Sequence, residues 1–462
     1  MKKANTRSAE KVTPSARQVQ WQETGFYGLV SFGMNTFTDS EWGSGGESPE
    51  LFAPEKLRVK QWARVAKGAG MKGLVLTVKH YDGFCLWHTA ETEHNIANSP
   101  YKNDLVAELA EACAAEGLKF GISVALWDRH DLRYGTGEPY EAFFLAQLRE
   151  LLTNYGELFY VHLDSTCGEG KKGRVQQHDM KKIYSLIRTL QPNAAIGGYG
   201  PDVRFSGNYV GFCRKAEWSA VPYYYAPMAP KAGDVKPPRK YSLTDLELGT
   251  AKKLKKGHRL IWYPAEVTMP MRKGWFYHES EMYDVKALSK LMDTWYAAVG
   301  GNACFMLGIS PDKTGRICES DMETLLSMGA QISIDFNEDL AQESRMTCSG
   351  CLDNRCGAEN VLLYDSSCWH SGTAEKSWIE IDLLDEYDIN KIVLREALSL
   401  GQHVEAFSVY AELDGKWQKM YTGTTIGFRC YCRFPEEVRV RRIRVEIEQT
   451  RDFAAIERLE AY

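Results

Sequence analysis

The chain has 462 residues, of which 44% are hydrophobic and 25% charged, with a formal net charge of −5. Single compact cores rarely grow past about 250–300 residues, so two or three domains are expected, and the acidic balance leaves no basic surface for nucleic acid. Neither the polar, basic segment 1–12 nor any later run offers the roughly 18 consecutive apolar residues of a membrane helix. We therefore predict a soluble protein with no signal peptide and no membrane span.

Apolar runs alternate with helix-like segments through the first two thirds of the chain. The helix-like segments include 104–117 and 139–155. Continuous apolar runs are typical of parallel strands buried on both faces, and their alternation with helices predicts a (β/α)8-type, TIM-like barrel over residues 1–340. A doubly wound open sheet is the alternative, which the lack of a Gly-rich loop after the first strand disfavours. The apolar runs cover residues 71–79, 118–127, 157–164, 258–266 and 303–310.

Past residue 340 the pattern changes to short runs that alternate or stay apolar, separated by turn residues, with no long helix between them. This spacing predicts a β-sandwich over residues 341–462. Cys348, Cys351 and Cys356 cluster near its start, but no histidines follow at ligand spacing. We expect an ordinary loop there, and no metal or cofactor. The runs of the sandwich cover residues 378–383, 389–394, 406–411, 426–434 and 438–448.

Polar and aromatic side chains follow the predicted barrel strands, at the end where barrel enzymes carry their active sites. Asp164 ends the apolar run FYVHL, where a carboxylate is costly to bury unless it is used or paired. Capping of the next helix is the alternative for this one residue. Carboxylates among aromatic rings, with no cofactor motif, favour glycoside hydrolysis, which needs a carboxylate at the anomeric carbon and usually a proton donor. The other strand-end residues are Glu41, Trp42, His80, Tyr81, Trp127 and Glu266.

Ordered motifs along nearly the whole chain resemble one family. They are SFGMNTFTDSEWG (31–43), KHYDGFCLW (79–87), WDR (127–129), LDSTCGEG (163–170), GPDVR (200–204), PAE (264–266), MRKGWFYHESE (271–281) and GISPDKTG (308–315). With these motifs the chain resembles the α-L-fucosidases of glycoside hydrolase family 29, particularly the branch acting on α-1,3/1,4-linked fucose. The sandwich resembles the galactose-binding-like, discoidin-type modules appended to that branch, which either bind glycan or support the barrel; we favour support.

The resemblance implies a retaining mechanism in which Asp164 attacks the anomeric carbon of an oligosaccharide or glycoconjugate. No cofactor takes part, and relatives in this family are often periplasmic or secreted. The residues that the resemblance places at the substrate are Glu41, Trp42, His80, Tyr81, Trp127, Tyr209, Glu266 and Arg272.

Three positions depart from the family pattern. Ser31 and Tyr81 stand where relatives carry histidines that bind fucose hydroxyls, and Tyr209 stands where the close branch carries its general acid/base glutamate. A phenol has a reference pKa near 10, so it is a weak general base at neutral pH. Glu217, eight positions later, is our candidate replacement, with Glu169 and Glu266 as others.

The leading interpretation is a retaining exo-glycosidase that releases terminal α-L-fucose. The departures leave two alternatives open: a glycosidase on the same scaffold with another sugar preference, or a catalytically impaired, carbohydrate-binding relative.

Overall fold

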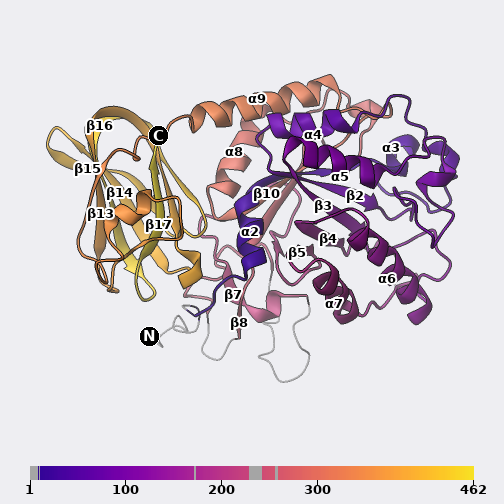
Figure 1. The fold of residues 1–462 in the computed structure, drawn as a ribbon, viewed down its shortest axis with the longest axis horizontal. Coiled ribbons are helices and arrows are strands. Elements are labelled where there is room, and N and C mark those ends of the chain that lie inside the picture. The colour runs from indigo at the N-terminus through magenta and orange to yellow at the C-terminus, as the bar shows by residue number, and fades with distance from the viewer. Residues whose placement is uncertain (1–8, 10, 171–172, 228–241, 255–258) are drawn as a thin grey trace.

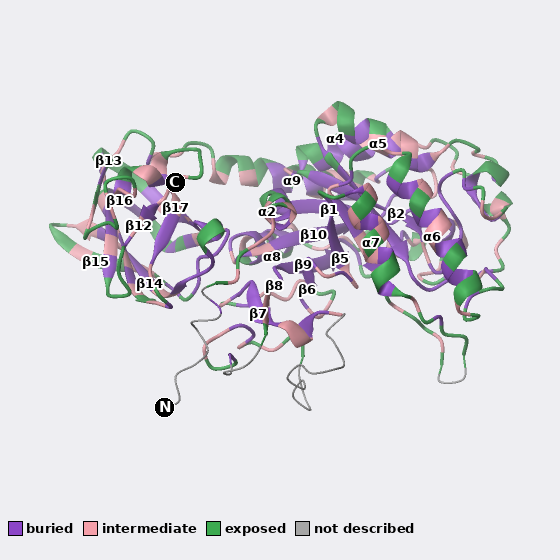
Figure 2. Ribbon diagram, turned by 60° about the horizontal axis from the view of Figure 1, so that its bottom comes forward, coloured by how far each residue is buried: buried purple, intermediate pink, exposed green. Residues whose placement is uncertain are grey.

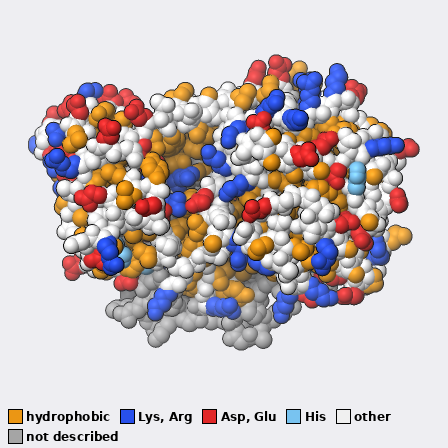
Figure 3. Space-filling view, viewed as in Figure 1, with side chains coloured by type: hydrophobic (Ala, Val, Ile, Leu, Met, Phe, Trp, Pro, Cys, Tyr) orange, Lys and Arg blue, Asp and Glu red, His pale blue; other side chains and the backbone are white. Residues whose placement is uncertain are grey.

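The computed structural model describes residues 9, 11–170, 173–227, 242–254 and 259–462. An α/β barrel and an all-β sandwich lie side by side, and the helix α9 (Glu319–Asp335) runs from one to the other (Figure 1). The predicted fold class, a barrel followed by a β-sandwich, is confirmed. Basic and acidic side chains are interspersed on the face drawn in Figure 3, which therefore presents no continuous patch of one sign.

Eight parallel strands form the barrel sheet in the order β5-β4-β3-β2-β1-β10-β9-β6. The barrel is nearly closed: among the described residues, no ladder joins β5 to β6. Every residue of β1 and β2 is buried, as expected for strands covered on both faces. The strands are β1 (Phe26–Val30), β2 (Gly73–Lys79), β3 (Lys119–Ala125), β4 (Tyr160–Asp164), β5 (Ala195–Gly198), β6 (Arg204–Phe205), β9 (Ala265–Pro270) and β10 (Ala303–Ile309).

One predicted strand, 258–266, is two strands in the structure. Residues Leu260–Trp262 form β8, which pairs antiparallel with β7 (Ala220–Pro222) outside the barrel, and β9 starts afterwards. Pro264 separates them, since proline has no N–H to donate to a ladder. Glu266 is therefore the second residue of β9, not the last residue of a strand as the sequence predicted. It lies deep in the barrel.

Helices cover the outside of the barrel, with their buried faces toward the strands and their exposed faces toward solvent (Figure 2). In α4, for example, Trp62, Ala63 and Ala66 are fully buried, and the lysines face outward. The helices besides α9 are α2 (Ala16–Thr24), α3 (Met34–Thr38), α4 (Val59–Gly68), α5 (Leu105–Glu116), α6 (Glu138–Thr153), α7 (Met180–Leu190) and α8 (Leu288–Val299).

The sandwich domain is built on antiparallel strands in the order β12-β17-β13-β16-β14-β15, with β11 on β13. Inward-facing Ile379, Ile381, Ile443 and Val445 alternate with polar residues along the two long central strands. Its strands are β11 (Arg345–Cys348), β12 (Trp369–His370), β13 (Ser377–Glu396), β14 (Val404–Leu413), β15 (Lys416–Gly423), β16 (Cys430–Thr450) and β17 (Ala455–Ala461).

Polar contacts join the sandwich to the barrel segment that leads into β7. The side chain of Gln402 accepts a hydrogen bond from the Ser219 amide (2.9 Å) and donates to the Glu217 carbonyl (3.1 Å). The Arg451 guanidinium lies 3.5 Å from the Trp218 ring centroid. The sandwich thus holds the backbone of residues 217–219 in place.

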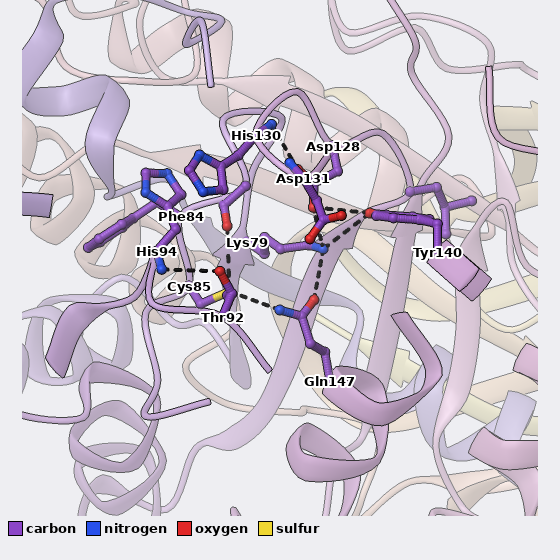
Figure 4. A network of polar contacts seen from close by, with 12 residues as sticks. Lys79, Phe84, Cys85, Thr92, His94, Asp128, His130, Asp131, Tyr140 and Gln147 are labelled. Atoms are coloured by element: carbon purple, nitrogen blue, oxygen red, sulfur yellow. Dashed lines mark hydrogen bonds and ion pairs between the residues drawn. The ribbon is translucent and has the colours of Figure 1, made fainter. Parts of the chain in front are cut away.

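A fully buried ion pair ties the end of β2 to the turn after β3 (Figure 4). Lys79 Nζ lies 3.2 Å from Asp128 Oδ2 and donates to Gln147 Oε1 at 2.9 Å. Tyr140 donates to the same Asp128 oxygen at 3.1 Å, so α6 is part of the network. Burial alone would raise the pKa of Asp128, but Lys79 and these donors hold it below its usual value. The pair fixes the residues on either side of it, which reach the cavity described below.

We expect Asp128→Asn to lower the free energy of unfolding by about 3–5 kcal/mol, because it leaves a buried ammonium group without its counter-charge. Urea denaturation measures the change. Glu138→Gln is the matched control: Glu138 pairs with Lys182 on the surface, and its loss should cost no more than about 1 kcal/mol. Equal losses in the two variants would contradict this account.

Candidate active site

A cavity of about 300 Å³ opens at the carboxyl ends of the barrel strands. This volume suits a small ligand such as one sugar residue. Polar side chains from β2, β3, β4 and β9 and from the loops that follow the strands surround it. The lining includes Ser31, Glu41, Trp42, His80, Tyr81, His162, Asp164, Tyr209, Glu266 and Trp275.

Asp164, the last residue of β4, is held by two donors. The Tyr81 hydroxyl donates to Oδ2 at 2.5 Å, and the Thr166 amide donates to Oδ1 at 2.9 Å. Burial alone would raise the pKa of this carboxyl, but His162, the Tyr81 hydroxyl and the Thr166 amide together hold it below its usual value. Asp164 is therefore ionised at neutral pH and faces the cavity.

Aromatic rings hold Tyr81 in position. The Trp127 ring packs at 5.1 Å from the Tyr81 ring, and the half-exposed Trp42 meets both rings edge-on at 5.6 Å. Trp127 itself is buried behind these rings and does not line the cavity, unlike the other two. His80 also lines the cavity, and burial lowers its pKa to about 4, so it is neutral.

Glu41 joins two loops at the mouth of the cavity. Its oxygens accept hydrogen bonds at 3.0 Å from the backbone amides of Trp275 and Phe276 and from the His278 ring. Burial would lower the pKa of His278, but the carboxylates of Glu41 and Asp39 outweigh it and raise that pKa. Glu41 thus acts in this structure as an acceptor that fixes the loop after β9.

Glu266 lies at the bottom of the cavity, almost fully buried. It accepts hydrogen bonds from the hydroxyls of Tyr27 and Tyr160, the latter at 2.7 Å. Burial and then the Glu266 charge raise the pKa of both phenols well above the usual value. The two tyrosines therefore keep their protons and hold this carboxylate.

Tyr209 lies at the mouth, 48% exposed, with its ring 4.7 Å from that of Phe205 and 5.5 Å from that of Trp275. Burial of its hydroxyl and the charge of Asp164 raise the pKa of Tyr209 to about 12. At neutral pH this phenol therefore cannot serve as a general base.

Besides Trp127, two further predicted site residues, Glu217 and Arg272, lie outside the cavity. Glu217 is buried in ion pairs with Arg204 and, at 2.8 Å, with Arg214. Burial raises its pKa, but the two guanidinium groups lower it below the usual value. The structure thus makes Glu217 an anchor of its segment, and sequence proximity to Tyr209 misled us because the chain leaves the mouth in between.

Arg272 is likewise buried away from the cavity. Its guanidinium forms a two-point ion pair with Asp321 of α9, with Nη2 2.7 Å from Oδ1. Glu169, another candidate acid, is not a lining residue, and its side chain packs against Gly173.

His162 lines the cavity but was not singled out from the sequence. It lies two residues before Asp164 on β4, and its Nδ1 lies 2.9 Å from the Ser123 hydroxyl of β3. Side chains alternate between the faces of a strand, so residues 162 and 164 share a face. That alternation is the sequence signal that could have identified His162 as a cavity residue.

The sequence matches the family model of alpha-L-fucosidase over residues 6–216 and 234–335 and that of the F5/8 type C domain over residues 345–459. The chain belongs to the α-L-fucosidases, glycoside hydrolase family 29. It is 34% identical to alpha-L-fucosidase 1 of Arabidopsis thaliana over 460 residues, 97% of this chain and 87% of the relative.

Solved structures of this family have the same architecture. A glycoside hydrolase 29 family member from an unknown rumen bacterium is 33% identical, with a TM-score of 0.79 over 98% of this chain and 77% of that one. A Ruminococcus gnavus family 29 fucosidase in complex with fucose superimposes with a TM-score of 0.83 over 98% of this chain and 95% of that one. At 24% identity, the latter shows the fold alone.

As a family 29 member, the chain is a glycoside hydrolase, and its C-terminal domain is of the F5/8 type C, discoidin-like kind. In the described part of the chain, no helix has both the length and the apolar character needed to cross a membrane. Within the same residues, no group of three or more potential ligand side chains is placed to hold a metal ion.

We expect Tyr81→Phe to move the acidic limb of the pH profile of kcat/KM to higher pH. We expect the native limb to follow protonation of Asp164, and removing the hydroxyl donor raises the pKa of that carboxyl group. A hydrogen bond to a charged group contributes about 1.5–3 kcal/mol, so the shift should be about one unit or more. An unshifted limb would show that the limb does not report Asp164.

We expect Glu217→Gln to lower the free energy of unfolding by about 3–5 kcal/mol, because two buried arginines lose their counter-charge. In the folded fraction, kcat/KM should fall far less than the roughly 10²–10⁴-fold loss of a missing acid/base. Thermal unfolding and initial rates, measured on the same sample, separate the two effects. A large rate loss at native stability would instead assign Glu217 to catalysis.

Proposed function

We propose that this protein is a retaining exo-glycosidase that releases terminal α-L-fucose, with Asp164 as the nucleophile. The observation that carries the proposal is an ionised carboxylate at the end of β4, held by Tyr81 and Thr166 and open to a cavity of sugar size. Two fixed donors aim such a group and keep it charged, as a nucleophile requires. The α-L-fucosidase names of its relatives favour fucose as the sugar.

The reaction takes place in two displacements. In the first, a bond forms between Asp164 and the anomeric carbon, and the glycosidic C–O bond breaks with its electron pair on the departing oxygen. In the second, water attacks the same carbon, the bond to Asp164 breaks with its electron pair on the carboxylate, and the proton of the attacking water passes to solvent. Two inversions leave the configuration of the released sugar unchanged.

The sugar subsite combines apolar and polar walls. Trp42 and Trp275 offer rings, and His80 offers a neutral imidazole whose Nδ1 has no hydrogen-bond partner among the described residues. A hydroxyl-bearing sugar fits both kinds of wall, because its ring has an apolar face and polar edges. We do not carry the α-1,3/1,4 linkage over from the resembling branch, because Tyr209 stands at the position of that branch's acid/base.

Polar residues deep in the cavity favour a second candidate function, the hydrolysis of a glycoside of a sugar other than fucose. His162 and Ser123, joined by a hydrogen bond, place polar atoms in the cavity, deeper than Asp164 and on the same face of β4. A sugar with a further polar substituent would meet partners there. A panel of 4-nitrophenyl glycosides distinguishes such a sugar from fucose.

We expect Asp164→Asn to lower hydrolysis of 4-nitrophenyl α-L-fucoside by about 10⁴–10⁶-fold, the loss typical of a missing nucleophile. Asp353→Asn, at an exposed carboxylate of the sandwich, is the matched control and should keep the native rate. NMR of the first product should show the α-anomer. Turnover that survives in Asp164→Asn would refute this assignment, and no turnover by the native protein would refute fucose.

A further inference from the structure

We infer that the natural leaving group is a phenolic hydroxyl, so that the substrates are aryl glycosides in place of sugar-linked fucosides. The inference rests on the proposed function, since it takes Asp164 as the nucleophile. It comes from two independent features of the cavity: the carboxyl groups around it and the character of its mouth.

Every carboxyl group that lines the described cavity has another task. The three are Glu41, Asp164 and Glu266. Glu41 accepts from two backbone amides and from His278, and Glu266 is held by two phenols at the bottom. Neither is free to donate a proton to a group leaving through the mouth.

Of the other titratable lining groups, Tyr81 already donates its hydroxyl proton to Asp164, and His80, Tyr209 and His162 do not supply the proton either. His80 is neutral because burial lowers its pKa to about 4, and burial raises the pKa of Tyr209 to about 12. His162 precedes Asp164 by two residues on the same strand, so it lies about 7 Å deeper in the barrel. Among the described residues, no lining group is therefore placed to protonate a leaving group at the mouth, and we infer that the group departs with little protonation.

The mouth itself is aromatic. We call Trp42, Tyr209 and Trp275 the rim: all three line the cavity, Trp42 and Tyr209 are nearly half exposed, and Tyr209 packs against Trp275. Val210, next to Tyr209, is 69% exposed. Exposed rings of this kind stack on a flat aromatic group.

The rim also distinguishes between classes of acidic leaving group. A phosphate or a carboxylate departs readily too, but it needs a cation near the mouth. Among the lining residues that the structure describes, Lys79 is the one lysine or arginine, and it is buried and paired with Asp128. The chemistry of the rim therefore favours an uncharged aromatic group.

A phenolic leaving group removes the need for the missing acid. Phenols ionise with a pKa of about 10, whereas water ionises near 16 and sugar alcohols resemble it. When Asp164 bonds to the anomeric carbon, the C–O electron pair passes to the phenolic oxygen. The phenolate leaves along the rim and takes its proton from water.

The test compares leaving groups on one sugar. With α-L-fucose held constant, the native protein is assayed on substituted phenyl fucosides of graded acidity and on a fucosyl disaccharide. We expect kcat/KM to rise steeply with phenol acidity and to be at least about 100-fold lower on the disaccharide, the loss expected without a positioned acid. Comparable rates on the two kinds of substrate would overturn the inference.

Two variants of Tyr209 test the cause. Tyr209→Glu supplies a carboxyl group at the mouth and should raise the rate on the disaccharide by about 10²–10⁴-fold. Tyr209→Gln, of the same size but without the acidic proton, is the matched control and should not. Equal behaviour of the two variants would contradict the role assigned to this position.

The aromatic rim is tested separately with α-L-fucosyl fluoride, an activated substrate without a ring. Tyr209→Ala should lower the preference for 4-nitrophenyl fucoside over the fluoride by about 3- to 10-fold, the contribution of one aromatic contact. An unchanged preference would overturn the claim that the rim binds the aromatic leaving group.

Failure of the proposed function gives a different pattern. If aryl glycosides of another sugar react and fucosides do not, the proposal of fucose as the sugar is wrong. The series of leaving groups on the sugar that reacts then tests the inference. If no aryl glycoside reacts, both fall.

Discussion

The hydrogen bond between the Tyr81 hydroxyl and Asp164 is the contact around which the cavity is organised. A carboxylate at the end of a buried strand loses most of its hydration, and it keeps its charge only where donors replace the water. Tyr81 is a donor whose pKa burial and the Asp164 charge raise, so the proton stays on the phenol. The same contact orients the carboxylate toward the cavity.

Tyr81 can hold Asp164 only if its own backbone is fixed, and the buried pair of Lys79 and Asp128 does this. Lys79 ends β2 two residues before Tyr81, and Asp128 follows Trp127, the ring that packs on Tyr81. An ion pair this deep adds little to net stability over an apolar pair, but it fixes the relative position of the two strand ends. The sandwich domain has a comparable task for the segment that leads into β7, since Gln402 bonds the backbone around Glu217.

The sequence was most informative where side-chain chemistry repeats along the chain. Continuous apolar runs identified β2, β3, β4 and β10, because strands covered on both faces need them. The ends of those strands then identified Asp164, His80 and Tyr81. Proline at position 264 hid the true start of β9, so Glu266 was expected at a strand end and lies near a strand start.

Spatial contacts between distant segments were not predictable in the same way. Glu217 and Arg272 are polar residues in loops near the predicted site, but each is neutralised by partners that only the folded chain brings together: Arg204 and Arg214 for the first, Asp321 for the second. A charged residue in a sequence carries no sign of whether it will face a ligand or another charge. His162 is the opposite case: it was not singled out, although strand alternation alone would have placed it on the same face of β4 as Asp164.

The ion pairs of Glu217 with Arg204 and Arg214 also explain why a small movement of its segment cannot bring this carboxylate to the mouth as an acid/base. Moving that carboxylate toward the mouth would leave two buried guanidinium groups without a counter-charge. The loss of a buried ion-pair partner costs about 3–5 kcal/mol of stability, which opposes such a movement. The segment is further fixed by hydrogen bonds to its backbone from Gln402 of the sandwich domain and from Asn302 of the barrel. Tyr209 therefore keeps its place at the mouth, and Asp164 is the one carboxyl group of the described lining that is not occupied in holding another segment.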